Sequence, residues 1–233
     1  MNHLDLSRRL AAVGEFVPAK ARLADIGSDH AYLPVALMLK GKIEFAVAGE
    51  VVKGPFESAQ KQVRKDGLEG RIIVRLANGL AAIEPSDGIT AITIAGMGGA
   101  LIRDILEAGK TRLTQKERLI LQPNIGERTL RVWLQENQYQ IIEEVILEEN
   151  KKIYEIIVAE KATSPVTYSP EDLMFGPILR KTKNAIFKAK WQRELTQREA
   201  IVRQMIQANK GAEISERQQT FEAEIKQIQE VLK

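Results

Sequence analysis

The sequence contains no cysteine and only two histidines. The lack of cysteine excludes disulfide bonds, thiolate metal sites and cysteine nucleophiles, and with so few histidines we expect no bound metal. No apolar run reaches the length of about 18 residues that a membrane-spanning helix needs, and the first five residues lack the basic-then-apolar order of a secretion signal. We therefore expect a cytoplasmic protein that does not use a membrane.

Charge is divided unevenly along the 233 residues of the chain. Residues 1–160 carry 21 Lys and Arg against 22 Asp and Glu, whereas residues 161–233 carry 13 against 9. Between Gly176 and Arg203 there are eight basic residues and two acidic ones. Such a surplus beside a neutral domain is typical of an appendage that binds a polyanion, although the solvated face of a helix would explain it equally well.

Short β-branched runs alternate with helical patterns between Arg22 and Ala162, which predicts an α/β fold with a largely parallel sheet. The predicted strands are Arg22–Ile26, Phe45–Gly49, Ile72–Leu76, Ala91–Ala95, Leu119–Gln122, Gln140–Glu148 and Lys152–Glu160. The predicted helices are Leu33–Leu39, Pro55–Lys65, Ala100–Ala108 and Glu127–Glu136. Because the last two strands adjoin, we expect an antiparallel hairpin at one edge. A seven-stranded sheet closed in this way is typical of Rossmann-like methyltransferases.

The rest of the chain is predicted to be a helical domain. Residues 163–170 contain two prolines and form a predicted linker, and Ser169 before Pro170 is a signal for the start of a helix. Apolar residues then recur every three or four positions, which indicates two long helices in an antiparallel, coiled-coil-like hairpin that turns near residues 209–211. Their apolar residues are Phe187, Trp191, Leu195, Val202 and Met205, then Phe221, Ile225, Ile228 and Leu232. We expect Trp191 to serve packing rather than base stacking, and we divide the chain into domains 1–162 and 163–233.

The most informative stretch is residues 23–33, where an apolar strand ends in Asp25 and a glycine turn follows. A Rossmann-type sheet holds a nucleotide-like cofactor at such a turn. The dinucleotide fingerprint G-x-G-x-x-G is absent, since Asp29 and Tyr32 occupy its second and third glycine positions. A carboxylate there would repel a pyrophosphate but suits S-adenosylmethionine, which carries an ammonium and a sulfonium group. The candidate cofactor-binding residues of this turn are Asp25, Gly27, Ser28 and Asp29.

The other parallel strands also end in polar or glycine residues, and such ends meet at one edge of a sheet. From the second strand to the fifth these ends are Glu50, then Asn78 and Gly79, then Ala95, Gly96, Met97, Gly98 and Gly99, and last Gln122, Pro123 and Asn124. Glu50 can bind both hydroxyls of a ribose, and Asn78 can meet an adenine edge. The glycines of the fourth end let a ligand approach the backbone. Five such ends together predict a cofactor site, although each alone could be a surface acid or a tight turn.

The end of the fourth strand also limits the acceptor. Enzymes that methylate the exocyclic amine of adenine or cytosine share an Asp/Asn-Pro-Pro-aromatic motif there, whereas this chain has residues 95–98 as Ala-Gly-Met-Gly. A ring nitrogen is therefore the better prediction, because its lone pair lies in the base plane and needs positioning more than deprotonation. Asp29 is the candidate catalytic residue, placed to bind the adjacent amino group or to accept a proton. Capping of the following helix is an equally weighted alternative for Asp29.

The motifs that carry a family resemblance are Asp25–Pro34, Gly49-Glu50 with Gly54-Pro55, Asn78-Gly79-Leu80, Ala95–Gly99 and Gln122-Pro123-Asn124. In combination they resemble bacterial tRNA (adenine-22, N1) methyltransferases over nearly the whole chain. The resemblance implies a Rossmann-like catalytic domain that uses S-adenosylmethionine, a C-terminal domain that helps to hold tRNA, and His30 as a further cofactor-binding candidate. The candidate RNA-binding residues are Gln122, Pro123 and Asn124 at the sheet edge and Lys183, Lys188, Lys190 and Arg193 on the first long helix.

Two other classes of function remain open from the residues alone. An NAD-dependent oxidoreductase would share Glu50 as a ribose ligand, but the chain lacks the glycine pattern and a proton donor near the fifth strand. A non-catalytic RNA-binding module would keep the basic helices but would not need five polar strand ends. Methyl transfer to tRNA is thus the principal prediction, by a protein that we expect to be a monomer.

Overall fold

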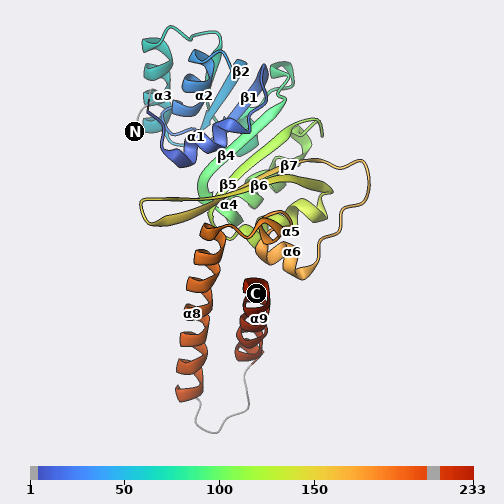
Figure 1. The fold of residues 1–233 in the computed structure, drawn as a ribbon. Coiled ribbons are helices and arrows are strands. Elements are labelled where there is room, and N and C mark those ends of the chain that lie inside the picture. The colour runs from blue at the N-terminus through green and yellow to red at the C-terminus, as the bar shows by residue number, and fades with distance from the viewer. Residues whose placement is uncertain (1–4, 209–215) are drawn as a thin grey trace. The chain divides into compact units, whose positions relative to one another are not determined.

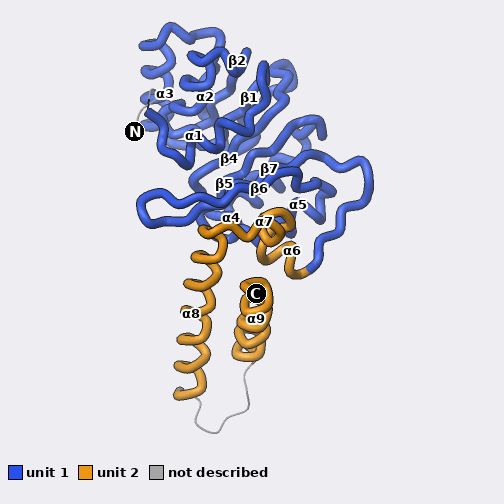
Figure 2. The backbone as a smooth tube through the Cα atoms, in the orientation of Figure 1, with its two compact units in different colours: residues 1–169 blue, residues 170–233 orange. Residues whose placement is uncertain are grey.

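The structure is a computed structural model that describes residues 5–208 and 216–233. It divides the chain into two compact units, a sheet unit of residues 1–169 and a helical unit of residues 170–233 (Figure 2). Pro170 already belongs to the helical unit, so the boundary falls near the end of the predicted linker rather than before it. The reason is that the Val166 N–H donates to Gln138 Oε1 at 3.0 Å and the Tyr168 hydroxyl accepts from the Ile141 N–H at 2.7 Å. These two bonds tie the linker to the sheet unit.

The sheet unit is a seven-stranded mixed sheet flanked by helices (Figure 1). Its strands are β1 Ala21–Ile26, β2 Ile43–Glu50, β3 Ile72–Leu76, β4 Ala91–Gly98, β5 Arg118–Ile125, β6 Tyr139–Glu149 and β7 Lys152–Lys161. Their order in the sheet is β3-β2-β1-β4-β5-β7-β6, with β7 antiparallel to both β5 and β6. The predicted sheet and its edge hairpin are therefore confirmed. The switch in strand order between β1 and β4 is where sheets of this kind bind ligands.

The helices of the sheet unit are α1 Arg8–Glu15, α2 Tyr32–Leu39, α3 Lys53–Lys65, α4 Gly99–Ala108 and α5 Glu127–Glu136, with short 3₁₀ turns η1 Gly79–Ala82, η2 Pro85–Asp87 and η3 Lys110–Arg112. Four of these helices were predicted, and α1 was missed. Its sequence signal is Ser7, whose Oγ accepts from the Leu10 N–H at 3.2 Å and so caps the helix. The core beneath the helices consists of fully buried residues on the central strands, such as Leu23, Ile92 and Leu119.

Strands β4 and β5 continue three residues beyond their predicted ends. After Ala95 pairs with Gln122, the ladder passes through a bulge and resumes with Met97 opposite Pro123 and Gly98 opposite Ile125. Gly96 occupies the bulge with φ +81°, a value that glycine adopts without steric cost. Residues 95–98 are thus the bulged end of a strand and not a tight turn.

The helical unit contains α6 Pro170–Phe175, α7 Leu179–Thr182, α8 Ala185–Ala208 and α9 Glu216–Leu232, and α8 and α9 run antiparallel (Figure 1). Phe187, Trp191 and Ile228 of the predicted apolar seam are buried. The Trp191 ring lies edge-on to Phe175 at 4.6 Å between centroids, which confirms its packing role. The predicted turn at residues 209–211 lies outside the described residues.

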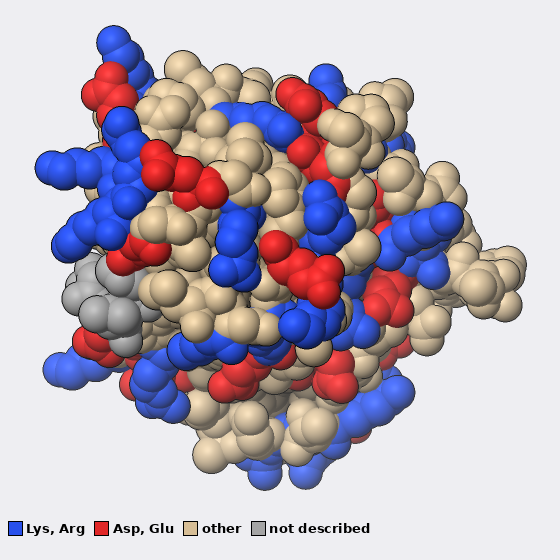
Figure 3. All heavy atoms as spheres, turned by 90° about the horizontal axis from the view of Figure 1, so that it is seen from above, with Lys and Arg blue, Asp and Glu red and all other residues tan. Residues whose placement is uncertain are grey.

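The two units differ in charge. Residues 1–169 carry 22 Lys and Arg against 22 Asp and Glu, whereas residues 170–233 carry 12 against 9. On the face that Figure 3 shows, basic and acidic side chains are interleaved. Across the ranges 5–208 and 216–233, the structure contains no helix with the length and apolar character required to span a membrane.

Candidate cofactor and acceptor site

The turn between β1 and α2 has an unusual backbone. Gly27 has φ +70°, and Asp29, His30 and Ala31 follow with φ values of +43°, +68° and +59°. Residues with a side chain avoid this left-handed region, at a cost of roughly 1–2 kcal/mol each. Such strain persists only where surrounding contacts hold the chain in place, and it concentrates at functional sites.

Asp25 supports the turn from beneath. Its Oδ2 accepts from the Ser28 hydroxyl at 2.5 Å and its Oδ1 accepts from the Thr93 hydroxyl of β4 at 2.6 Å. Asp25 and Ser28 are both buried. Burial raises the pKa of the Asp25 carboxyl, and the two hydroxyl bonds oppose that rise only in part. Both residues therefore fix the shape of the turn and join β1 to β4. The sequence predicted that they contact the cofactor, and the structure shows them supporting the turn from beneath.

Glu50 holds the turn from the side of β2. Its Oε1 accepts from the Asp29 N–H at 2.6 Å, while the Gly27 N–H donates to Gly49 O at 2.9 Å. Glu50 is 6% exposed, so it is not a surface acid. Burial raises the pKa of its carboxyl above the usual value, although the bond from Asp29 lowers it in part. A buried carboxylate at a strand end suits a ligand that offers hydroxyl donors.

The Asp29 side chain is 71% exposed, and its Oδ1 lies 3.5 Å from Nε2 of His30. The His30 ring in turn stacks on Tyr32 with 5.2 Å between centroids. Helix α2 begins at Tyr32 after a left-handed Ala31, and no side chain caps it. The capping alternative for Asp29 is therefore wrong, and the carboxylate remains available to a ligand or a substrate.

The glycines at the end of β4 serve different purposes. A Cβ on Gly99 would lie 2.2 Å from Gly126 O, so this glycine allows α4 to pack closely on the loop after β5. A Cβ on Gly98 would meet no atom within 4 Å, which leaves room beside its backbone. Met97 packs on the first turn, since a Cβ on Gly27 would lie 2.1 Å from Met97 Cε. The interpretation that these glycines admit a ligand therefore fits Gly98 and does not fit Gly99.

Gln122 organises the end of β5. Its Oε1 accepts from the Gly96 N–H at 2.9 Å, and its Nε2 donates to Pro123 O at 2.8 Å and to Asn124 Oδ1 at 3.3 Å. The Asn124 amide then donates to Gly96 O at 2.8 Å, which closes a ring of bonds between β4 and β5. Gln122 is fully buried, as is nearly all of Pro123, so they are not placed to contact RNA as predicted. Asn124 is exposed and keeps its candidate role.

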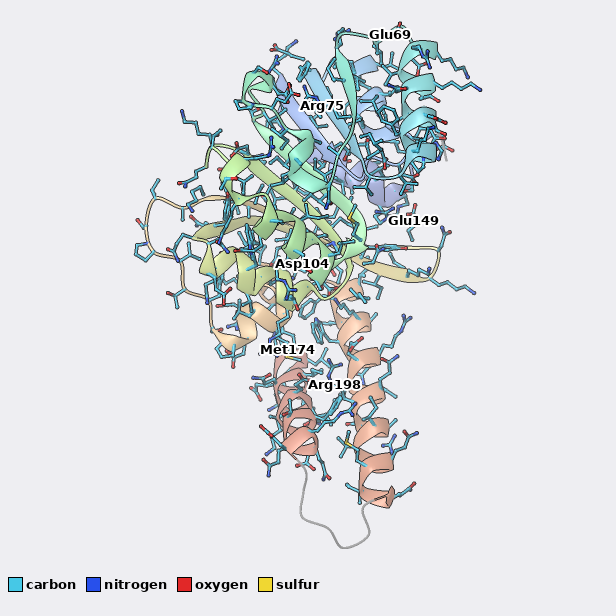
Figure 4. The ribbon with its side chains drawn as sticks, turned by 180° about the vertical axis from the view of Figure 1, so that it is seen from behind. Glu69, Arg75, Asp104, Glu149, Met174 and Arg198 are labelled. Carbon is cyan, nitrogen blue, oxygen red and sulfur yellow. The ribbon has the colours of Figure 1, made fainter. Side chains whose placement is uncertain are left out.

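Arg9 is a site residue that the sequence analysis missed. Its guanidinium donates to Gln122 Oε1 and lies over the Tyr154 ring, 5.4 Å from the centroid. Helix α1 is held in place from the hairpin, because the Arg8 N–H donates to Glu149 Oε1 at 2.6 Å (Glu149 is labelled in Figure 4). The cap at Ser7 could have revealed α1 from the sequence. The contact between Arg9 and Gln122 could not be foreseen, because it joins positions 113 residues apart.

The end of β3 joins the site through Glu50, whose backbone oxygen accepts from the Ala77 N–H at 2.8 Å. Asn78 is exposed, and with Gly79 it lines a cavity of about 320 Å³ beside α4. Asp104 of α4, which is labelled in Figure 4, also lines this cavity. Gly79 has φ +54° and packs on Ile105. All five predicted strand ends are therefore linked by hydrogen bonds, from β3 through β2, β1 and β4 to β5.

The basic candidates lie in the helical unit. Lys188 and Arg193 are exposed on α8, whereas Lys190 is half-buried with its Nζ 5.4 Å from the centre of the Trp191 ring. Lys183 does not belong to α8, because it ends α7 in a left-handed conformation with φ +41°. The prediction that Lys183 lies on the first long helix is therefore wrong.

The chain is similar to proteins of known family over nearly its whole length. The family model described as tRNA (adenine(22)-N(1))-methyltransferase matches residues 23–230. A Bacillus subtilis (strain 168) protein of that name is 51% identical over 212 residues, which cover 89% of each chain. A Streptococcus pneumoniae structure solved in complex with S-adenosyl-L-methionine is 47% identical with a TM-score of 0.88, over 98% of this chain and 100% of that one. The structure of M. capricolum TrmK with S-adenosyl-homocysteine is 26% identical with a TM-score of 0.84, over 98% and 99% of the two chains.

Proposed function

The chain belongs to the tRNA (adenine(22)-N(1))-methyltransferase family, and we propose that it transfers the methyl group of S-adenosylmethionine to N1 of adenine 22 in tRNA. The observation that carries this proposal is the left-handed turn at residues 27–31, docked through the Asp29 N–H on the buried carboxylate of Glu50. Family membership and this turn argue together against the NAD-dependent oxidoreductase and the non-catalytic RNA-binding module.

The residues of the turn fit S-adenosylmethionine. The cofactor supplies a methyl group activated by a neighbouring sulfonium charge. Asp29 and Glu50 place two carboxylates at one sheet edge, which suits a cation and would disfavour a pyrophosphate. The Oε1 atom of Glu50 accepts from the Asp29 N–H. We propose that the same carboxylate also accepts from the ribose. We propose that Asn78 contacts the adenine of the cofactor, and that the backbone beside Gly98 lies next to the reacting end of the cofactor.

The acceptor side is assigned to Asn124 and Asp29, whose side chains are both exposed. N1 of adenine uses an in-plane lone pair to form the new bond, so the base must be held at a fixed angle more than it must lose a proton. The base gains positive charge as that bond forms, and we propose that the Asp29 carboxylate stabilises this charge or binds the adjacent amino group. Arg9 and Gln122 are proposed as positioning residues that hold Asn124 and the β4 bulge.

We assign tRNA binding in part to the helical unit. Residues 170–233 carry 12 basic against 9 acidic residues, while the sheet unit is neutral. Lys188, Lys190 and Arg193 of α8 are proposed phosphate contacts, with Lys190 restricted by its packing on Trp191. A tRNA substrate also agrees with a cytoplasmic location, which we retain as part of the proposal.

The test uses the full chain, labelled S-adenosylmethionine and two transcripts of one tRNA that differ at position 22. The A22 transcript should yield labelled 1-methyladenosine after digestion to nucleosides, whereas a G22 transcript should yield none. The matched transcripts share fold and charge, so a difference between them reports the reacting base. Equal labelling of both, or label in a different nucleoside, would contradict the proposed site of methylation. Binding of NADH in place of S-adenosyl-homocysteine in calorimetry would contradict the cofactor.

A further inference from the structure

The helical unit contains a cavity of about 590 Å³ between the short helices α6 and α7 and the C-terminal part of α9. Its volume is within the range of roughly 300–1,000 Å³ that small-molecule sites occupy. Phe175 and Val231 contribute apolar lining, and six charged side chains surround it. They are Glu171, Arg180, Lys181, Lys183, Lys226 and Glu230. All of these residues belong to the helical unit, so the cavity is complete within it.

The acidic side chains of the cavity already have cations of their own. Glu171 pairs with Arg180 at 4.0 Å, and Arg180 also reaches Asp172 at 3.3 Å. Glu230 pairs with Lys233 at 2.6 Å. The bond from Lys233, and at longer range the charge of Lys183, hold the pKa of the Glu230 carboxyl below its usual value. Three carboxylates thus share two cations, which leaves one negative charge to offset part of the positive charge that remains.

Three lysines make up that remainder. Lys181, Lys183 and Lys226 line the cavity, and within residues 5–208 and 216–233 none of them forms an ion pair. They come from two segments distant in sequence, the end of α7 and the middle of α9. Three ammonium groups around one concavity produce an attractive potential for an anion that would not arise from a solvated helix face.

The backbone at Lys183 gives a second reason to regard the cavity as a binding site. Lys183 ends α7 with φ +41° and ψ +48°, in a place where glycine is the favoured residue. Its N–H donates to Leu179 O at 2.9 Å, so the helix end is formed in the usual way apart from the side chain. Lys183 therefore places a long cationic side chain in the cavity lining at a position where glycine would fit the backbone better.

We propose that this cavity binds a phosphodiester group of the tRNA backbone through Lys181, Lys183 and Lys226. The inference rests on the proposed function, because it names where the helical unit holds the tRNA. With this proposal, the main contact between the helical unit and tRNA moves from the exposed surface of α8 to the cavity between α7 and α9. Only Lys183 is shared with the set of basic residues expected from the sequence.

The test compares two full-length variants that lose the same charge. The cavity variant is Lys181→Gln with Lys226→Gln, and the surface variant is Lys188→Gln with Arg193→Gln on α8. Affinity for the A22 transcript is measured over a series of salt concentrations, with S-adenosyl-homocysteine affinity as the control for the sheet unit. The cavity variant should bind tRNA about tenfold more weakly, with a log–log salt slope lower by about 0.7–0.9 per lost contact. The surface variant should weaken binding less than about threefold.

Lys183→Gly separates binding from folding. Glycine suits the left-handed backbone, so the melting temperature should stay the same or rise while tRNA affinity falls by about threefold. The KM for tRNA should rise in each cavity variant with kcat unchanged, since the reacting groups lie elsewhere.

The possible outcomes separate this inference from the proposed function. If only the surface variant weakens tRNA binding, the cavity assignment is wrong and the tRNA role of the helical unit stands. If both variants weaken it equally, the attraction is diffuse and the cavity assignment is again wrong. If neither changes tRNA affinity or the salt slope, both the cavity and the tRNA role of the helical unit are overturned.

Discussion

Each unit of the protein contains an arginine held between two glutamates. In the sheet unit, Arg131 of α5 donates to Glu144 of β6 at 2.8 Å and to Glu155 of β7 at 2.5 Å. In the helical unit, Arg198 of α8 donates to Glu224 of α9 at 2.8 Å and also pairs with Glu194 (Arg198 is labelled in Figure 4). The side chains of the first cluster are at most 1% exposed, whereas those of the second are 20–33% exposed.

The comparison shows that burial decides what such a cluster does. Burial alone would lower the pKa of Arg131, but Glu155 and Glu144 together raise it, so the guanidinium stays charged without access to water. A buried cluster of this kind fixes α5 to the β6–β7 hairpin and leaves no charge for a partner. The Arg198 cluster remains in contact with solvent, where salt screens it. The same arrangement of charges is thus closed to water and salt at Arg131 and open to both at Arg198.

The largest effect should come from Arg131→Met. This variant leaves two glutamates buried together without their cation, which costs roughly 3–5 kcal/mol of unfolding free energy. Urea denaturation followed by circular dichroism measures the loss. Adding Glu144→Gln and Glu155→Gln to the same chain should restore most of it, because neutral side chains need no cation. A loss below about 1 kcal/mol in the single variant would show that the cluster does not hold α5 to the hairpin.

The next largest effect should come from Asp29→Asn. The substitution keeps the shape and the backbone bond to Glu50 but removes the charge, so turnover on tRNA should fall by about 100-fold, equivalent to about 2.7 kcal/mol of barrier. Affinity for S-adenosyl-homocysteine should change by less than about twofold. Asp29→Gly is a matched control for the backbone, because glycine suits φ +43° and should be as inactive as the Asn variant. Turnover within about threefold of the native protein would remove Asp29 from the chemistry.

Glu50→Gln should weaken S-adenosylmethionine binding by roughly 1.5–2 kcal/mol at pH 8, since a charged acceptor is replaced by a neutral one. The native affinity should also fall as the pH drops through the Glu50 pKa, which burial places above 4.5, and this fall should be absent in the variant. The folding signal has the opposite sign. Because the pKa is raised in the folded state, the protonated carboxyl is preferred there, and stability relative to Glu50→Gln increases as the pH falls. A native affinity independent of pH between about 4.5 and 7 would exclude a charged Glu50 from the cofactor site.

Much of the sheet unit could be predicted because its signals are local. Apolar runs and the polar residues after them identified the seven strands and the five strand ends, and the structure joins those ends. The left-handed run at residues 29–31 could not be predicted, because it runs against intrinsic preference and is held by the bond from the Asp29 N–H to Glu50 of another strand. The burial of Gln122 and the role of Arg9 depend on a contact across 113 residues. In the sequence, Arg131 looks like a surface residue of an amphipathic helix. In the fold it is buried, because β6 and β7 cover it.

The smallest effect should come from Arg198→Met, which keeps the apolar stem of the side chain and removes only its charge. The pairs with Glu194 and Glu224 are partly exposed, so the loss of unfolding free energy should be about 0.5–1 kcal/mol. Raising the salt concentration to 1 M shortens the screening length to about 3 Å, and the difference between Arg198→Met and the native protein should then nearly vanish. The loss in Arg131→Met should persist at the same salt concentration, because salt does not reach a buried cluster. A salt-independent loss above about 2 kcal/mol in Arg198→Met would mean that both units use their arginine in the same way, and the contrast between them would fail.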